Sequence, residues 1–227
     1  MTKNANLTGP SRGPANGNKP EQMIIMAHGV GADGNDLINL ASYFEKVLPK
    51  ALFIAPNGPE KFDSSDTGYQ WFSLSDPNYE ARIKGLRTAS KILNLFIDEQ
   101  LAATGLSERE TALVGFSQGT MLALWAGLRR PKPLAAILGY SGALIGDTEL
   151  KDEIRSKPPV LLVHGQIDPV VPFDSMQQAL ETLRQLGIKA DGLARPDIGH
   201  GMDDDGVKAG MFFLADCFNV DLQGLKE

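Results

Sequence analysis

Residues 112–121 read ALVGFSQGTM, and this stretch decides the fold. A short apolar run leads into Gly115, Ser117 and Gly119, and an apolar helical pattern begins directly after them. A buried strand that turns abruptly into a helix is typical of a layered α/β protein. Ser117 at this point is either an ordinary turn residue or an exposed nucleophile, and the two readings demand different partners elsewhere in the chain.

The chain around this turn alternates between short apolar runs and longer amphipathic patterns. Nearly continuous apolar runs predict strands that are covered on both faces of a parallel sheet, and they lie at 22–28, 51–56, 111–116, 134–140, 159–164 and 188–194. Apolar residues spaced three and four apart predict helices, and these lie at 36–47, 79–103, 118–128, 174–186 and 204–217. This alternation predicts an α/β fold with a mostly parallel central sheet, helices on both faces and right-handed crossovers.

The N-terminal segment, residues 1–21, is rich in Gly, Pro and Asn, which predicts an extended arm with little regular structure. Residues 22–227 are expected to form one domain, because no linker or repeat divides them. A long segment at 57–78 carries four aromatic residues and no clear helical or strand pattern. Structureless connections of this length are uncommon in compact domains and are often functional.

Composition excludes several classes of function. The formal net charge is −6, from 22 basic and 28 acidic residues, whereas nucleic-acid binding usually shows a basic patch or stripe. No apolar run approaches the roughly 18 residues of a membrane span, and the first 22 residues lack the apolar core of a signal peptide. One cysteine, Cys217, permits neither an internal disulfide nor a zinc-binding cysteine cluster, and it is expected to pack in the core. These features predict a cytoplasmic protein without stable membrane insertion.

The turn itself carries the pattern G-x-S-x-G between a predicted strand and a predicted helix, which is the context of a nucleophile elbow. Small residues on both sides of Ser117 let the strand and the helix approach closely. The N-terminus of the following helix points free N–H groups at developing negative charge. The context therefore favours Ser117 as a nucleophile.

A serine hydroxyl needs a base to take its proton before it attacks. The chain contains three histidines, His28, His164 and His200, and each is followed by a glycine. In α/β-hydrolases the catalytic residues follow the order serine, acid, histidine. Only His200 follows Ser117 and also leaves an acid at a strand end before it. His200 is therefore the predicted base, and His28 is expected to brace a loop.

The predicted acid is Asp168, which follows the strand predicted at 159–164. Functional groups of open α/β sheets gather beyond the carboxyl ends of the strands. Asp168 would accept a hydrogen bond from the imidazole, fix its tautomer and stabilise the imidazolium. Other acids remain as alternatives. Asp174 is expected to be a helix N-cap, and Asp203 to Asp205 are expected to be negative charges in the first turn of a helix. Asp197 precedes His200 by only three residues, which is too close in the sequence for the acid.

An oxyanion hole requires two N–H donors aimed at one point. One is expected from the backbone of Gln118, the residue after the nucleophile. The other is expected from the backbone of Val30, in the glycine-rich segment HGVGADG at 28–34. Glycines in this segment let the backbone approach a ligand.

Taken together, these residues resemble the acyl-protein thioesterase/carboxylesterase/lysophospholipase family of small α/β-hydrolases. The matching segments span roughly residues 22–215 in family order and read HGVGADGNDL, APNGP, QWFSL, GFSQGTMLAL, YSGAL, VHGQIDPVVP and GHGMDDDG. The resemblance implies an α/β-hydrolase fold, with Ser117, Asp168 and His200 as the triad and the N–H groups of Val30 and Gln118 as the oxyanion hole. It implies no metal and no organic cofactor, and it is compatible with a homodimer.

The predicted function is that of a serine hydrolase, which cleaves carboxylic esters of short to medium acyl chains through an acyl-enzyme intermediate. Acyl-protein thioesterase and lysophospholipase activities are the alternatives within the family. A peptidase on the same scaffold is a further alternative, and a catalytically silent binding module is disfavoured because all three triad residues are present. The substrate would be a small-molecule or lipid ester.

An acyl chain requires an apolar groove near the nucleophile. The candidates lie in loops near predicted strand ends: Trp71, Phe72, Leu74, Leu144 and Ile145. The alternative for the aromatic residues is that they pack the long 57–78 segment onto the body of the protein.

Overall fold

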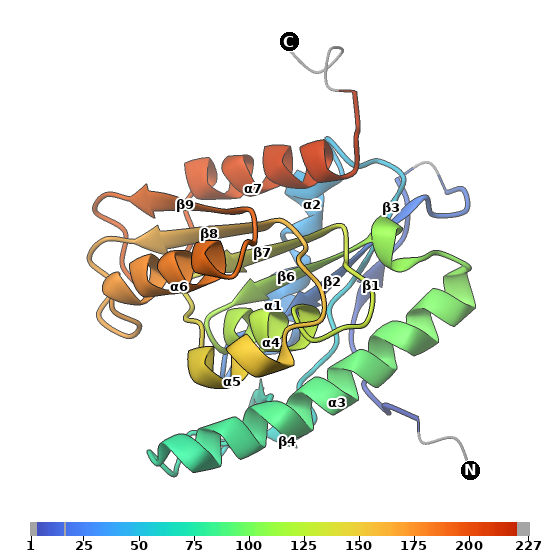
Figure 1. Ribbon diagram of the computed structural model, residues 1–227. Coiled ribbons are helices and arrows are strands. Elements are labelled where there is room, and N and C mark those ends of the chain that lie inside the picture. The colour runs from blue at the N-terminus through green and yellow to red at the C-terminus, as the bar shows by residue number, and fades with distance from the viewer. Residues whose placement is uncertain (1–3, 16, 222–227) are drawn as a thin grey trace.

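The computed structural model describes residues 4–15 and 17–221. Its central sheet has seven strands in the order β1-β3-β2-β6-β7-β8-β9 (Figure 1). Only β1 runs antiparallel to its neighbour, and the other pairs are parallel, which confirms the predicted mostly parallel sheet. The strand bounds are β1 Ser11–Arg12, β2 Gln22–Ala27, β3 Ala51–Ile54, β6 Thr111–Phe116, β7 Ala136–Tyr140, β8 Val160–Gly165 and β9 Ala190–Arg195.

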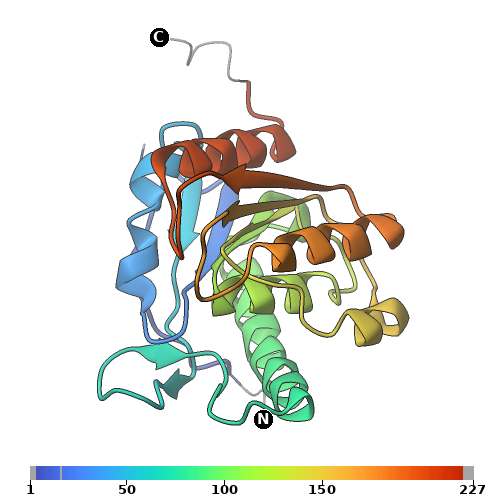
Figure 2. The ribbon, with the colours of Figure 1, turned by 90° about the vertical axis from the view of Figure 1, so that its left-hand side faces the viewer.

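Helices cover both faces of this sheet (Figures 1 and 2). One face carries α3 (Tyr79–Thr104), α4 (Gln118–Gly127), α5 (Asp147–Glu153) and α6 (Asp174–Gln185). The other face carries α1 (Gly34–Ile38), α2 (Ala41–Phe44) and α7 (Asp204–Cys217). Successive side chains of a strand point to opposite faces, so Ile25 of β2 joins the first core cluster and Ile24 joins the second. This double burial explains why the central strands are continuously apolar.

The helix predicted at 36–47 is wrong as a single element, because the structure divides it into α1 and α2. Asn39 lies at the break, and its side-chain amide donates to the carbonyl oxygens of Asn35 and Asp36. Continued α-helix would have used those two carbonyls for backbone hydrogen bonds. Asparagine competes with the backbone in this way, which makes it unfavourable inside helices.

The long segment at 57–78 contains more order than its sequence predicts. Its strands β4 (Glu60–Lys61) and β5 (Tyr69–Gln70) form a small antiparallel hairpin apart from the main sheet. A short 3₁₀ turn at Glu108–Glu110 precedes β6, and α5 follows β7. Neither was predicted, because each is short and α5 contributes only Leu150 to the buried set.

The described part of the N-terminal arm lies along the edge of the sheet. Its strand β1 pairs with β3, and the N–H groups of Ala55 and Asn57 donate to the carbonyls of Pro10 and Thr8. At the other end, Cys217 is half-buried against the second core cluster, and desolvation raises the pKa of its thiol to about 11. No helix within the described ranges is both long and apolar enough to cross a membrane.

Candidate active site

Ser117 occupies the turn between β6 and α4 with an unusual backbone conformation. Its φ of 52° and ψ of −115° lie outside the regions that non-glycine residues normally adopt. The flanking glycines are required by close backbone approach. A Cβ on Gly119 would lie 1.8 Å from the carbonyl oxygen of Ala27, and one on Gly115 would lie 2.5 Å from the carbonyl carbon of Gly119. The G-x-S-x-G pattern is therefore a steric requirement of this turn.

The three residues predicted as a triad form a chain in which His200 lies within hydrogen-bonding distance of both Ser117 and Asp168. Ser117 Oγ is 3.0 Å from His200 Nε2, and His200 Nδ1 is 2.8 Å from Asp168 Oδ2. These distances are compatible with a serine hydroxyl that donates to an imidazole, whose opposite N–H donates to the carboxylate. Ser117 is 6% exposed, so this end of the hydrogen-bonded chain is buried but not sealed from solvent.

Asp168 is held in its charged form although its side chain is fully buried. Burial alone would raise the pKa of this carboxyl group. Hydrogen bonds from His200 and from the backbone N–H groups of Val171 and Val170 outweigh the burial, and the net pKa lies below the ordinary value. The carboxylate is thus a stable negative partner for a histidine that takes up a proton.

The two expected oxyanion donors are unused. Neither the N–H of Val30 nor that of Gln118 donates to another residue in the described part of the chain. Both belong to segments that adjoin the nucleophile: Gln118 follows it, and a Cβ on Gly29, next to Val30, would lie 3.4 Å from Ser117 Cβ. The arrangement brings two free N–H groups to the neighbourhood of the serine hydroxyl.

His28 braces the segment that carries Val30, as its position in the sequence suggested. Its Nδ1–H donates to the carbonyl of Gly29 at 2.7 Å, and its Nε2 accepts from the N–H of Gly58 at 2.8 Å. Desolvation lowers the pKa of this buried imidazole, which keeps it neutral and able to accept that hydrogen bond.

Comparison with known proteins shows the family to which the chain belongs. A family model described as Phospholipase/Carboxylesterase matches residues 14–218. The chain belongs to the phospholipase/carboxylesterase family. Family membership makes the chain a hydrolase of ester or thioester substrates with the α/β-hydrolase fold, which confirms the resemblance, the fold and the enzyme class predicted from the sequence.

Individual similar proteins show how far the likeness extends. The crystal structure of esterase PE8 is 40% identical, with a TM-score of 0.89 over 93% of this chain and 99% of that one. Acyl-protein thioesterase 1 of Kluyveromyces lactis is 29% identical over 67% of this chain and 72% of its own length. Esterase YpfH of Escherichia coli is 26% identical over 81% of this chain and 78% of its own.

Two contacts close to Asp168 and His200 were not predicted from the sequence. His164 Nε2–H donates to the carbonyl of Val171 at 2.9 Å and lies 3.3 Å from Asp168 Oδ2. Arg195 Nε and Nη2 donate to the carboxylate of Asp203, at the two ends of the loop that carries His200. Asp203 was expected as a first-turn charge, but it is the N-cap of α7, whereas the N-cap expectation for Asp174 is wrong because Phe173 holds that position and Asp174 is the first residue of α6.

The five predicted groove residues divide into two groups. Trp71 and Phe72 are each 1% exposed and belong to the first core cluster, so they have almost no free surface to offer an acyl chain. Leu74 is 38% exposed, and Leu144 and Ile145 are half-buried in the loop after β7. Burial of the two aromatic rings agrees with the alternative that they pack the 57–78 segment onto the body.

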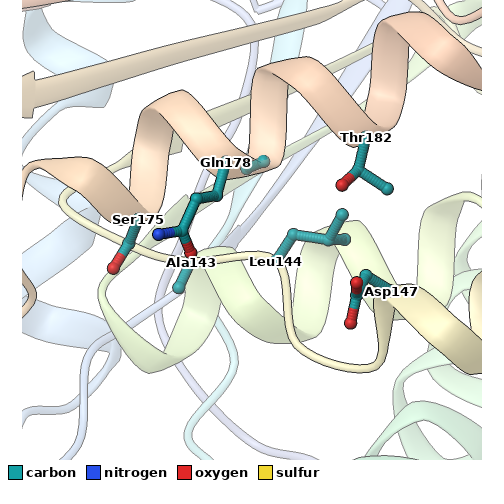
Figure 3. Close-up of a pocket in the computed structure, with 7 residues that line it drawn as sticks. Ala143, Leu144, Asp147, Ser175, Gln178 and Thr182 are labelled. Carbon is teal, nitrogen blue, oxygen red and sulfur yellow. The ribbon is translucent and has the colours of Figure 1, made fainter.

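Leu144 lines a cavity of about 200 Å³ between the loop after β7 and helix α6 (Figure 3). Polar side chains form much of its wall, and the full lining is Ala143, Leu144, Asp147, Ser175, Gln178, Ala179 and Thr182. The loop begins beside the nucleophile, because a Cβ on Gly142 would lie 2.9 Å from the carbonyl oxygen of Ser117. Among the described residues, no group of three or more metal-binding side chains is positioned to hold a metal ion.

Proposed function

We propose that this protein is a serine hydrolase that cleaves carboxylic esters with short to medium acyl chains through an acyl-enzyme intermediate. The observation that carries the proposal is the continuous hydrogen-bonded chain from Ser117 Oγ through His200 to Asp168. A base within hydrogen-bonding reach of the nucleophile, itself oriented by a third group, is the geometric signature of nucleophilic catalysis.

In the first half-reaction, Ser117 Oγ attacks the ester carbonyl carbon while His200 Nε2 takes the hydroxyl proton. The carbonyl oxygen becomes an oxyanion and accepts hydrogen bonds from the N–H groups of Val30 and Gln118. Asp168 stabilises the imidazolium formed at this stage. The tetrahedral intermediate then collapses, the C–O bond to the alcohol breaks, and His200 Nε2–H protonates the departing oxygen.

In the second half-reaction, His200 takes a proton from water, and the resulting hydroxyl attacks the acyl-enzyme carbonyl. The second tetrahedral intermediate uses the same oxyanion donors. Its collapse breaks the bond to Ser117 Oγ and releases the carboxylic acid, while His200 returns the proton to the serine.

The small cavity beside Leu144 is the candidate site that we propose for a short or medium acyl chain. Its volume of about 200 Å³ is below the roughly 300–1,000 Å³ typical of pockets for drug-sized ligands. Its polar wall, which includes Asp147 and Gln178, is unsuited to a long alkyl chain. We assign Leu144 to acyl binding, and the partly exposed side chains of Leu74 and Ile145 are further candidates for apolar contact with the acyl chain.

Thioester cleavage is the second candidate, because acyl-protein thioesterase 1 of Kluyveromyces lactis is among the similar curated proteins. The same attack on a thioester carbonyl would expel a thiol in place of an alcohol. Lysophospholipase activity is a further variant of the same chemistry. A cytoplasmic location and a homodimer belong to the proposal, and the single cysteine is compatible with a reducing compartment.

The proposal is tested by measuring kcat/KM for p-nitrophenyl esters from acetyl to dodecanoyl, with Ser117→Ala as the control. We expect the best rate among the shorter esters and loss of activity in the control. A parallel series of acyl thioesters ranks the second candidate. If the wild-type protein and Ser117→Ala were equally inert on every ester and thioester, the proposed function would be wrong.

A further inference from the structure

The indole ring of Trp71 packs in the core, but the indole N–H and the backbone N–H of this residue form hydrogen bonds to the two segments that carry the expected oxyanion donors. The side chain is 1% exposed. Its ring N–H donates to the carbonyl oxygen of His28 at 2.9 Å, and its backbone N–H donates to Oε1 of Gln118 at 2.8 Å. One residue thus makes buried hydrogen bonds both to the segment that carries Val30 and to Gln118.

The side-chain amide of Gln118 forms two hydrogen bonds to the backbone of residues 71–72. Its Nε2 donates to the carbonyl of Phe72 at 2.8 Å, while its Oε1 accepts from Trp71 as described. Gln118 is 1% exposed, so water does not compete for these bonds. The residue whose backbone N–H is one oxyanion donor is therefore anchored, through its side chain, to residues 71–72.

The segment carrying the other donor is bonded to the same short stretch. The N–H of Gly31 donates to the carbonyl of Tyr69, and the N–H of Tyr69 donates to the carbonyl of Ala32, both at 2.8 Å. Val30 therefore lies between two attachment points, His28 and Gly31, that are both bonded to residues 69–71.

The two oxyanion donors come from different places in the chain, after β2 and after β6. An oxyanion hole works only if both N–H groups lie about 2.7–3.1 Å from one oxygen atom, and a misplacement of about 1 Å can lower a rate about 100-fold. Residues 69–72 contact both sides, and within them Trp71 is the residue that bonds to each side directly.

We propose that Trp71 is a positioning residue that sets the separation of the Val30 and Gln118 N–H groups, and that its indole N–H is the atom responsible on the Val30 side. This inference rests on the proposed function, because it concerns the same oxyanion hole. It replaces the expectation that Trp71 lines the acyl groove, which its burial disfavours.

The test is Trp71→Phe, which removes the indole N–H and keeps an aromatic ring in the core. Trp125→Phe is the matched control, because Trp125 is also 1% exposed, belongs to the same core cluster and packs on Arg129, and no hydrogen bond among the described residues joins its side chain to Gln118 or to the segment at 28–34. For both variants, kcat and KM are measured across the p-nitrophenyl series, together with the affinity for a trifluoromethyl ketone, which forms an oxyanion with the nucleophile.

We expect Trp71→Phe to lower kcat about tenfold or more for every acyl length, to leave KM within about twofold, and to weaken ketone binding in parallel. Trp125→Phe should leave all three unchanged. A shift of the preferred acyl length with kcat preserved on the best ester would instead assign Trp71 to the groove and overturn the inference. An unchanged kcat in folded Trp71→Phe would overturn it as well.

If Trp71→Phe does not fold, kcat and ketone affinity are measured on Gln118→Met. This substitution removes the two side-chain hydrogen bonds to residues 71–72 and keeps the backbone N–H of residue 118. A kcat and ketone affinity equal to wild type in that variant would contradict the inference. An inert wild-type protein would overturn the proposed function and this inference together, whereas an active wild type with an unaffected variant overturns the inference alone.

Discussion

Because the backbone at Ser117 is strained, we expect Ser117→Gly to be more stable than Ser117→Ala, which reverses the usual order of stability for glycine and alanine. Ser117→Ala and Ser117→Gly both remove the hydrogen bond between Oγ and His200, so their difference isolates the backbone. At an ordinary position, glycine makes a protein about 0.5–1 kcal/mol less stable than alanine, because it loses more conformational entropy on folding.

At Ser117, φ is 52° and ψ is −115°. A non-glycine residue in such a sparsely populated region costs about 1–3 kcal/mol, and glycine adopts positive φ without this penalty. Subtracting the entropic cost of glycine from the relieved strain leaves Ser117→Gly more stable than Ser117→Ala by about 1 kcal/mol. For a domain of this size, that corresponds to a Tm higher by roughly 2–4 °C.

The assay is urea or thermal unfolding of the two variants in parallel, followed by circular dichroism. Both variants lack the hydroxyl group of Ser117, so the difference between their unfolding free energies reports the backbone alone. If Ser117→Gly were less stable than Ser117→Ala by the ordinary glycine penalty, the turn would not be strained, and the account of the nucleophile elbow would be wrong.

Three further predictions concern the surroundings of the nucleophile. Asp168→Asn should lower kcat by about 10⁴-fold, because the amide cannot stabilise the imidazolium; Asp174→Asn, an exposed helix-start carboxylate, should retain full activity in the same assay. His28 has a lowered pKa when folded, so the unfolded chain binds its proton first as the pH falls below about 6.5. Unfolding free energy should therefore fall more steeply from pH 7 to pH 5 in wild type than in His28→Gln, and equal slopes would contradict a neutral, buried His28. Gly119→Ala, whose Cβ would meet backbone, should lower the unfolding free energy by about 3 kcal/mol or more, whereas Gly13→Ala, with open space around it, should leave it unchanged.

The sheet and most helices could be predicted because buried positions are apolar, and their spacing along the sequence differs between strands and helices. β6 and α7 were predicted with the bounds that the structure has, since an apolar run and an amphipathic period mark them clearly. The break between α1 and α2 could not be predicted, because the apolar spacing continues through it. It depends on the Asn39 side chain, whose local hydrogen bonds a periodic pattern does not record.

Some features of the candidate site could also be predicted from the sequence, and others could not. The turn at Ser117 and its glycines could be predicted because a strand-to-helix turn imposes steric limits on neighbouring residues in the sequence. The hydrogen bonds of Trp71 and Gln118 could not, because they join residues 43 to 47 positions apart. An aromatic residue in a long irregular segment suggests an exposed binding surface equally well, and only its burial separates the two readings.

Whether Ser117 is the nucleophile of this hydrolase can be measured by mass spectrometry of the protein after reaction with a fluorophosphonate. We expect one adduct per chain, which peptide mapping places on Ser117 and which is absent from Ser117→Ala. His200→Gln, which lacks the base, should react far more slowly. No adduct on the folded wild-type protein, or an adduct that persists in Ser117→Ala, would contradict the account.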